Sequence, residues 1–137
     1  MVEIPTYVLD TFAILAYLQD EPAAPRIEEL LVLAKKVKCY LALSLINLGE
    51  ILYIAERQGG TPKAHDILRF ISSLPIQIIP ADEQMVFAAA HIKANHPISY
   101  ADAFAASVAE KLSGTLLTGD PEFKVLEEFI EVEWLEV

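Results

Sequence analysis

Short apolar runs that are typical of β-strands alternate with longer amphipathic stretches along this sequence. No two of these runs are joined by a tight hairpin turn. The alternation therefore predicts an α/β sandwich with a mainly parallel sheet. The strand runs are residues 7–9, 39–42, 76–79, 115–118 and 130–135.

Helical spacing of apolar residues and local capping signals place the helices between these runs. Ser44 is a candidate N-cap for a helix that ends at Gly59-Gly60, and Thr61-Pro62 starts another helix that reaches about Ser73. Pro97 closes off the preceding helix before Ser99 begins the next one. The predicted helices are residues 12–18, 22–36, 44–58, 61–73, 82–95 and 99–113, with a short one after 121.

The size and composition of the chain favour one domain that has partners. The 137 residues contain no linker, repeat or low-complexity tract, so we expect a single domain over residues 1–137. Hydrophobic residues make up 54% of the chain and the mean hydropathy is +0.39. These values are high for a single soluble domain, and they predict that another chain covers some apolar surface.

The first residues do not resemble a signal peptide, because residues 1–5 carry no basic start and Asp10 breaks the apolar segment that follows. The charge-free stretches at residues 39–49 and 70–81 are shorter than the ~20 apolar residues of a membrane span. We therefore expect no membrane insertion and a cytoplasmic location. Cys39 is the one cysteine and fits a small core residue better than a nucleophile. The net charge of -10 argues against a general nucleic-acid-binding surface unless part of the acidity belongs to a metal site.

Four carboxylates stand out among the twenty acidic residues because their sequence neighbours are apolar: Asp10, Glu50, Asp102 and Asp120. A carboxylate removed from water is costly unless a cation or hydrogen bonds compensate. Asp10 and Asp120 also follow predicted strands directly, and ligands of open α/β sheets bind beyond the carboxyl ends of strands. We therefore expect the four acids to converge on one site.

Polar residues near these acids are candidates for supporting roles. Asn47 lies one helical turn before Glu50 and shares its face, which predicts an amide beside a metal-binding carboxylate. Thr11 and Thr118 are hydroxyls that could orient ligands or substrate. Ser99 is the expected cap of the helix that carries Asp102.

An all-oxygen ligand set without His or Cys favours a hard cation, Mg²⁺ or Mn²⁺, over zinc. The substrate suited to such a site is a phosphate ester, because the metal supplies hydroxide near neutral pH and stabilises charge on the leaving oxygen.

Purely structural roles of the four acids compete with this interpretation. Asp10 and Asp120 fit helix N-caps, and Ser99-Tyr100-Ala101-Asp102 has the form of a capping box. Glu50 lies in mid-helix, where capping does not explain it.

Four segments taken in order resemble the PIN-domain family, and the VapC-type toxin branch in particular. They are Val8-Leu9-Asp10-Thr11 with Ala13, Asn47-Leu48-Gly49-Glu50, Ser99-Tyr100-Ala101-Asp102-Ala103 and Thr118-Gly119-Asp120-Pro121-Glu122-Phe123.

This resemblance implies a three-layer α/β/α fold with a five-stranded parallel sheet in which the first and fourth strands are adjacent. It also implies an endoribonuclease dependent on Mg²⁺ or Mn²⁺, with Asp10, Glu50, Asp102 and Asp120 as catalytic metal ligands. The implied partners are the RNA substrate, a second copy in a homodimer and a small antitoxin.

Other classes fit less well. A PIN protein of RNA processing that is no toxin, and a catalytically silent PIN scaffold that binds a protein, both remain open. A haloacid-dehalogenase-like phosphatase requires a second Asp where Phe12 stands, and a receiver domain requires an acidic pair and a late Lys that are not evident. A histidine-based ribonuclease would need His65, His91 and His96 to converge, although the last two lie ~140° apart around a helix.

Overall fold

The computed structural model describes residues 3–137, and its centre is a sheet of five parallel strands in the order β3-β2-β1-β4-β5. Leu9 at the end of β1 pairs with Leu43 of β2 on one side and with Leu117 of β4 on the other. The carboxyl ends of these three strands therefore meet at one edge. The strands are β1 (Thr6–Leu9), β2 (Tyr40–Ser44), β3 (Gln77–Ile79), β4 (Thr115–Thr118) and β5 (Glu131–Trp134).

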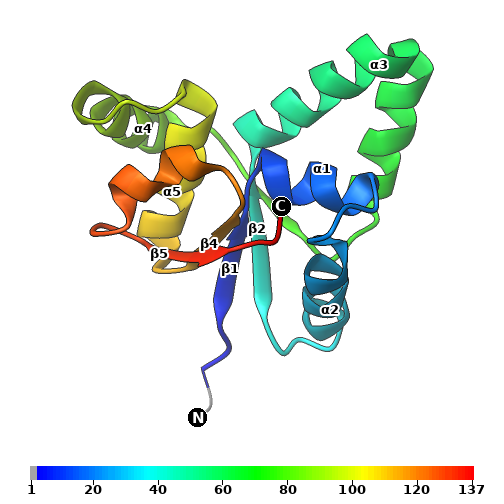
Figure 1. The fold of residues 1–137 in the computed structure, drawn as a ribbon, viewed down its shortest axis with the longest axis horizontal. Helices are drawn as coiled ribbons and strands as arrows, with labels where there is room; N and C mark the ends of the chain where they lie inside the picture. The colour runs from blue at the N-terminus through cyan, green and yellow to red at the C-terminus, as the bar shows by residue number, and fades with distance from the viewer. Residues whose placement is uncertain (1–2) are drawn as a thin grey trace.

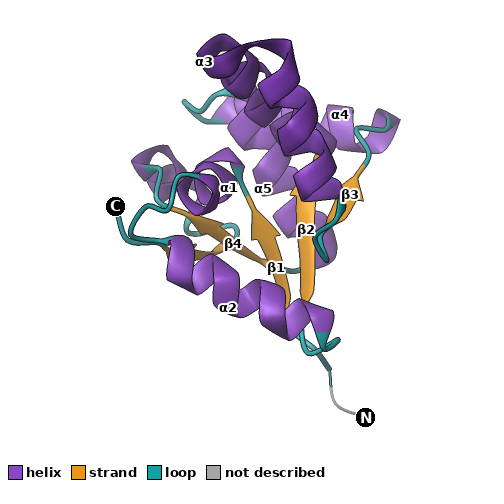
Figure 2. Ribbon diagram, turned by 90° about the vertical axis from the view of Figure 1, so that its right-hand side faces the viewer, coloured by secondary structure: helices purple, strands orange, loops and turns teal. Residues whose placement is uncertain are grey.

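Helices cover both faces of the sheet, which confirms the predicted three-layer architecture. The helical elements are α1 (Thr11–Leu18), α2 (Ala24–Lys35), α3 (Leu45–Ser72), α4 (Glu83–Asn95), α5 (Tyr100–Leu112) and the 3₁₀ helix η1 (Pro121–Leu126). Figure 1 shows α1, α2 and α3 on one side of the strands and α4 and α5 on the other, and Figure 2 shows α2 in front of the sheet.

Alternation of side chains along the strands separates two cores. Leu9 and Leu117 pack into the core beneath α1, α2 and α3, whereas their neighbours Val8 and Leu116 pack into the core beneath α4, α5 and η1. All four side chains are fully buried. Burial on both faces is the condition that parallel sheets require, and it explains why the strand runs contain few polar residues.

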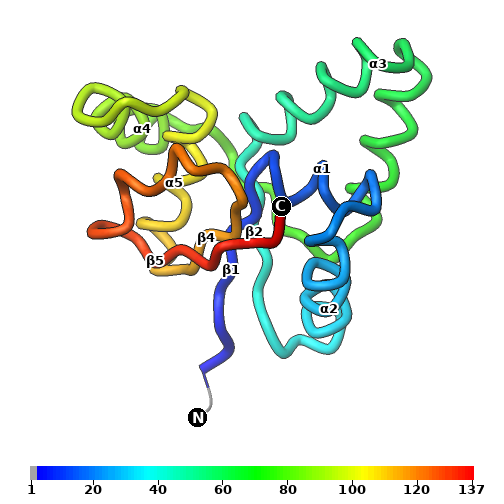
Figure 3. The backbone as a smooth tube through the Cα atoms, in the orientation of Figure 1, coloured from blue at the N-terminus to red at the C-terminus, as the bar shows by residue number. Residues whose placement is uncertain are grey.

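The predicted helix break at Gly59-Gly60 is a sharp bend inside α3. Gly60 has φ 80° and ψ 176°, a conformation that side chains with a Cβ rarely adopt, and Pro62 follows it. Figure 3 shows the chain reversing direction at this bend, so α3 projects as a helical hairpin. Its first half begins at the cap Ser44, whose Oγ accepts a hydrogen bond from the Ile46 N–H at 3.1 Å. No helix in residues 3–137 is long and apolar enough to cross a membrane.

Candidate functional site

The four predicted carboxylates line one cavity of about 350 Å³ at the carboxyl edge of the sheet. Asp10 follows β1 directly, and Asp120 lies two residues beyond the adjacent strand β4. Asp102 is in the first turn of α5, and Glu50 is in the first half of α3. Parallel strands thus bring together residues that are more than 100 positions apart in the sequence. Thr11, Ser99 and Glu122 also line this cavity.

Asp10 is the most buried of these acids, with 1% of its surface exposed. Its Oδ1 accepts a hydrogen bond of 2.8 Å from the Ala13 N–H, so it does cap α1. Burial nevertheless raises the pKa of Asp10 to about 7, and the nearby charge of Asp120 adds to this rise. Hydrogen bonds from Thr118 and Ala13 act in the opposite direction and lower the pKa. Capping alone therefore does not compensate the charge of this carboxylate.

The tightest acidic cluster consists of Asp102, Asp120 and Glu122, each of which offers one carboxylate oxygen within 4.8 Å of the others. Asp102 is 8% exposed, and its pKa is raised to about 8. Burial is the main cause, followed by a hydrogen bond with Glu122 and the charge of Asp120. Ionised carboxylates this close repel one another, and a cation between them would remove that repulsion.

Glu50 lies on the wall of the cavity and is only half-buried. Its Oε2 accepts a 3.5 Å hydrogen bond from the hydroxyl of Tyr53, one turn further along α3. Within the described residues it is not a member of the 4.8 Å cluster. The apolar residues beside Glu50 in the sequence predicted a more buried carboxylate than the structure shows. They face the core, whereas the carboxylate faces the cavity.

The supporting residues hold the acids and the elements that carry them. The fully buried Thr118 hydroxyl bonds to Asp10 and accepts from the Asp120 N–H at 3.0 Å, so it joins two of the acids and is not exposed to the cavity's solvent. Ser99 Oγ caps α5 by accepting from the Asp102 N–H at 3.1 Å, and it also lowers the Asp102 pKa. Thr11 lines the cavity beside Asp10.

Asn47 is placed differently from the expectation, because its amide does not lie among the residues lining the cavity. It is completely buried and donates to Thr11 Oγ1 at 3.1 Å and to the Ala101 carbonyl at 3.4 Å. These bonds tie the start of α1 to the start of α5. Asn47 Oδ1 is buried without a hydrogen-bond partner among the described residues.

Sequence reasoning missed Glu122 as a site residue. It is exposed, and its backbone N–H donates to Asp120 Oδ1 at 2.9 Å in the first turn of η1, where acidic residues are common for local reasons. The sequence did contain a signal for Glu122, because it lies two residues after Asp120 within the last of the four segments that resemble the PIN-domain family. Gly119 is also necessary, because a methyl group there would overlap the ring of Phe12, which lines the cavity.

The residues present fit a hard divalent cation. All the clustered donors are carboxylate oxygens, and two of the carboxylates have pKa values raised by burial and by one another. Asp102, Asp120 and Glu122 could hold such an ion directly, with Asp10 and Glu50 facing the same cavity. A bound cation would offset the repulsion that the cluster otherwise carries.

Comparisons with known proteins agree with this arrangement. The structure of VapBC2 from Rickettsia felis bound to a promoter DNA fragment matches with a TM-score of 0.74 and 23% identity, covering 96% of this chain and 99% of that chain. DNA-bound VapBC from Salmonella typhimurium gives a TM-score of 0.73 and 20% identity, covering 95% and 98% of the two chains.

A third similar structure is VapC20 from Mycobacterium tuberculosis, described as a toxin that cleaves the sarcin-ricin loop. Its TM-score is 0.71 at 19% identity, and the match covers 93% of this chain and 98% of that chain. At these identities the likeness concerns the fold. No curated protein matches the sequence.

The family model of the PIN domain matches residues 7–128, from the first strand to just beyond η1, and so includes every carboxylate of the cavity. The chain therefore belongs to the PIN-domain family.

Proposed function

We propose that this protein is an endoribonuclease that uses Mg²⁺ or Mn²⁺ to hydrolyse RNA phosphodiester bonds, and that it is the toxin of a VapBC-type toxin-antitoxin pair. The observation that carries the proposal is the carboxylate cluster at the carboxyl edge of the sheet, where Asp102, Asp120 and Glu122 offer oxygens within 4.8 Å of one another. A structural role accounts for single caps but leaves this concentration of negative charge unexplained.

In this proposal each acid of the cavity has a distinct task. Asp102, Asp120 and Glu122 bind the cation, and Asp10 completes its coordination from the end of β1. Glu50, which faces the cavity from α3 and contacts the hydroxyl of Tyr53, orients the attacking water. When bound, the cation supplies an activated water and stabilises the charge on the leaving oxygen.

RNA as substrate is supported by the family and by one of the similar structures. VapC20, which shares this fold, is described as cleaving an RNA loop. The chain is acidic overall, so its affinity for RNA depends on the metal and on a few cations near the cavity. Arg57 lies two turns after Glu50 on α3, above the ring of Tyr53 at 4.9 Å. We also propose a cytoplasmic location, because that is where the protein would meet its RNA substrate.

The partners we propose are a second copy of the chain and a small antitoxin. Three of the similar structures, from Rickettsia felis, Salmonella typhimurium and Haemophilus influenzae, are VapBC complexes. A groove of about 380 Å³ lies between α2 and the end of α3. Its apolar lining residues are Leu31, Val32, Leu74 and Pro75, and its polar ones are Tyr17, Glu28, Lys35 and Ser73. A groove that combines apolar residues with both charges is suited to an amphipathic segment of an antitoxin.

The test is cleavage of structured and unstructured RNAs by the purified protein with Mg²⁺, with Mn²⁺ and with EDTA. We expect endonucleolytic products with either metal and none with EDTA. Asp102→Asn should abolish cleavage, whereas Asp82→Asn, which changes an exposed cap of α4 outside the cavity, should not. A correctly folded wild-type protein that cuts no RNA with either metal would instead support a silent scaffold.

A further inference from the structure

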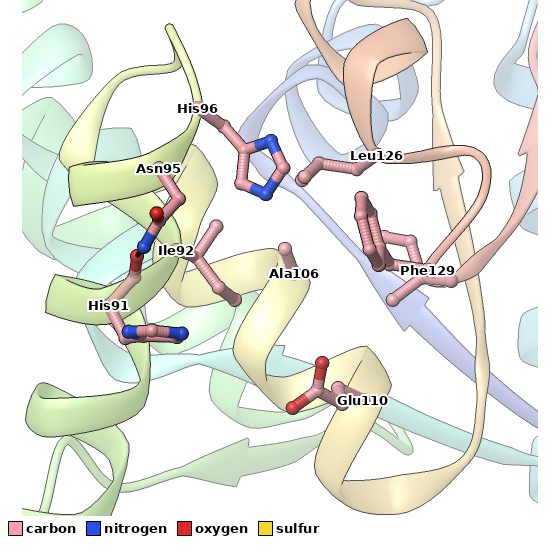
Figure 4. Close-up of a pocket in the computed structure, with 9 residues that line it drawn as sticks. His91, Ile92, Asn95, His96, Ala106, Glu110, Leu126 and Phe129 are labelled. Carbon is pink, nitrogen blue, oxygen red and sulfur yellow. Dashed lines mark hydrogen bonds between the residues drawn. The ribbon is translucent and has the colours of Figure 1, made fainter.

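A second cavity, of about 280 Å³, lies between α4, α5 and the segment that joins η1 to β5. Figure 4 shows His91 and Glu110 reaching into it from α4 and α5, and His96 entering from the loop between these helices. Leu126 and Phe129 line the opposite wall. The cavity is separate from the carboxylate site and shares none of its lining residues.

The polar side chains around this cavity lie at the surface: His91, Asn95 and Glu110 are exposed, and His96 is half-buried. Over residues 3–137, neither imidazole and neither oxygen of the Glu110 carboxylate takes part in a side-chain hydrogen bond or salt bridge. Asn95 is different, because its amide donates to the His91 carbonyl at 2.9 Å. The set comprises two imidazoles, which can donate or accept, and one carboxylate, which accepts only.

The apolar part of the cavity includes an aromatic pair. His96 and Phe129 meet at 5.2 Å between ring centroids with an interplanar angle of 65°. Phe129 is 61% exposed, although the buried Leu126 lies next to it in the same wall. An exposed ring beside unpartnered polar groups is suited to a flat ligand that both stacks and forms hydrogen bonds.

The two cavities lie along the same two helical elements. On α5, Asp102 faces the carboxylate site, and Ala106, four residues later, faces the second cavity. On η1, Glu122 and Leu126 repeat the same four-residue step. Residues four apart on an α-helix are about 5–6 Å apart, so along α5 the walls of the two cavities are one turn apart. Glu110 lies two turns after Asp102, about 12 Å along the same helix, which a bound RNA chain can span.

We propose that this second cavity binds one unpaired base of the RNA, next to the bond that is cut, and that it prefers a base with an exocyclic amino group. The inference rests on the proposed ribonuclease function. Glu110 accepts hydrogen bonds only, and amino groups of bases donate to carboxylates, whereas uracil has no amino group to offer. A phosphate is excluded by the negative charge of Glu110.

A metal ion is a poorer occupant of this cavity. Among the described residues, the carboxylate cluster of Asp102 is the one group of three His, Cys, Asp or Glu side chains close enough to share an ion. The ligand atoms of His91, His96 and Glu110 thus do not all lie within 4.8 Å of one another, as they do in the carboxylate cluster. A volume near the lower end for ligand pockets suits one base and not a whole nucleotide chain.

The test is to sequence the cut sites of wild-type protein and variants in a library of RNAs randomised around the cleaved bond, with Mg²⁺. We expect wild type to favour C, A or G over U at one position beside the cut. Glu110→Gln should lower kcat/KM on the favoured sequences roughly tenfold and leave cleavage of sequences with U at that position unchanged. Glu128→Gln, an exposed acid outside the cavity, should match wild type.

Phe129→Ala should raise KM for every sequence without changing the base preference, because stacking does not depend on base identity. Cleavage without any base preference, or with the same preference after Glu110→Gln, would overturn the inference and leave the proposed function standing. Cytidine binding is a second measurement. If cytidine shifts the NMR signals of His91 and His96 but Glu110→Gln keeps the wild-type cleavage preference, the cavity binds free nucleosides without selecting the base of the RNA. That result would also overturn the inference and leave the proposed function standing. A wild-type protein that cuts no RNA would refute both proposals.

Discussion

Asp10 caps α1 at the end of β1 and, under the proposed function, is also a metal ligand. One oxygen of its carboxylate accepts from the Ala13 N–H, which satisfies a free donor at the start of α1. The rest of the carboxylate faces a cavity shared with other acids, and burial raises its pKa to about 7. The two tasks respond differently to substitution, because an amide can cap a helix but is a much poorer ligand for Mg²⁺ than a carboxylate.

We expect Asp10→Asn to lower RNA cleavage by orders of magnitude while the metal-free protein keeps or gains thermal stability. The amide preserves the cap and removes a buried charge that faces Asp120. Cleavage rates and melting temperatures in EDTA at pH 8 measure both effects. Asp82→Asn is the matched control, since Asp82 Oδ1 caps α4 by accepting from the Met85 N–H at 2.9 Å outside the cavity. Wild-type cleavage by Asp10→Asn would show that this residue is only a cap.

The raised pKa values of Asp10 and Asp102 also predict how stability depends on pH without metal. Between the ordinary value of 3.8 and the folded values of about 7 and about 8, the folded state binds more protons than the unfolded state. The contribution of these two groups is therefore fully present below pH 3.8 and is lost as the pH rises towards 8. The expected loss is on the order of a few kcal/mol.

Denaturant unfolding in EDTA at several values between pH 5 and pH 8 measures this slope, and Asp10→Asn should reduce it. Added Mg²⁺ should stabilise the protein more at pH 8 than at pH 5, because the metal binds ionised carboxylates. Stability in EDTA that is the same at pH 5 and pH 8 for both proteins would contradict the burial of charge at this site.

At the scale of the elements, two of the three glycines in α3 have opposite roles. Gly49 lies inside the first half of the helix, where an added Cβ would meet nothing within 4 Å. Gly60 forms the bend with φ 80° and ψ 176°. We expect Gly49→Ala to stabilise the protein by up to about 1 kcal/mol and Gly60→Ala to destabilise it by roughly 1–3 kcal/mol. Chemical denaturation of both variants tests this, and equal effects would mean that the bend is not fixed by Gly60.

Most of the fold was predictable because each element carries its own local signal. Gly59-Gly60 marked the bend of α3, and apolar runs bounded by turn residues marked all five strands. Some boundaries were less accurate. The run at residues 39–42 ends earlier than β2, which continues to Ser44, because Ser44 is both the last strand residue and the cap of α3. Because Ser44 has both roles, no turn residue separates the strand from the helix in the sequence.

Apart from Asp102, which was included for its apolar neighbours although a capping box also explains it, the site was predictable where an acid lacked a local explanation or followed a strand. Asp10 and Asp120 satisfied the second condition, and adjacent parallel strands brought them to one cavity. Glu122 satisfied neither, since it is exposed at the start of η1 within an acidic segment. Its closeness to Asp102 depends on the packing of η1 against α5, which spacing along the chain does not encode.

For the whole molecule, the high apolar content corresponds to hydrophobic side chains left on the surface. Val32 of α2 is 45% exposed and Phe70 of α3 is 42% exposed, beside the groove that ends at Leu74. Phe70 stacks on Tyr17 at 6.3 Å between ring centroids, which links α3 to α1. Val32, Phe70 and the groove are therefore the candidate contact surface. Their burial in an assembly remains a prediction.

We expect the protein to be a dimer at micromolar concentration, or to co-purify with its antitoxin when the two are expressed together. Val32→Asp places a charge among the apolar lining residues of the groove and should prevent antitoxin binding without reducing RNA cleavage. Light scattering and co-purification measure the two associations, and Val37→Asp on an exposed turn at the end of α2 is the control. A monodisperse monomer that also binds no antitoxin would contradict this account.

The most direct measurement for the account as a whole is a crystal structure of the protein with Mn²⁺, using anomalous scattering at the manganese edge. We expect an anomalous peak within coordination distance of Asp102 and Asp120, in the cavity that Asp10 and Glu50 also line. Asp102→Asn crystals treated in the same way should lose the peak. An empty cavity in the wild-type crystal, in a preparation that cuts RNA when Mn²⁺ is present, would show that these carboxylates are not the metal site.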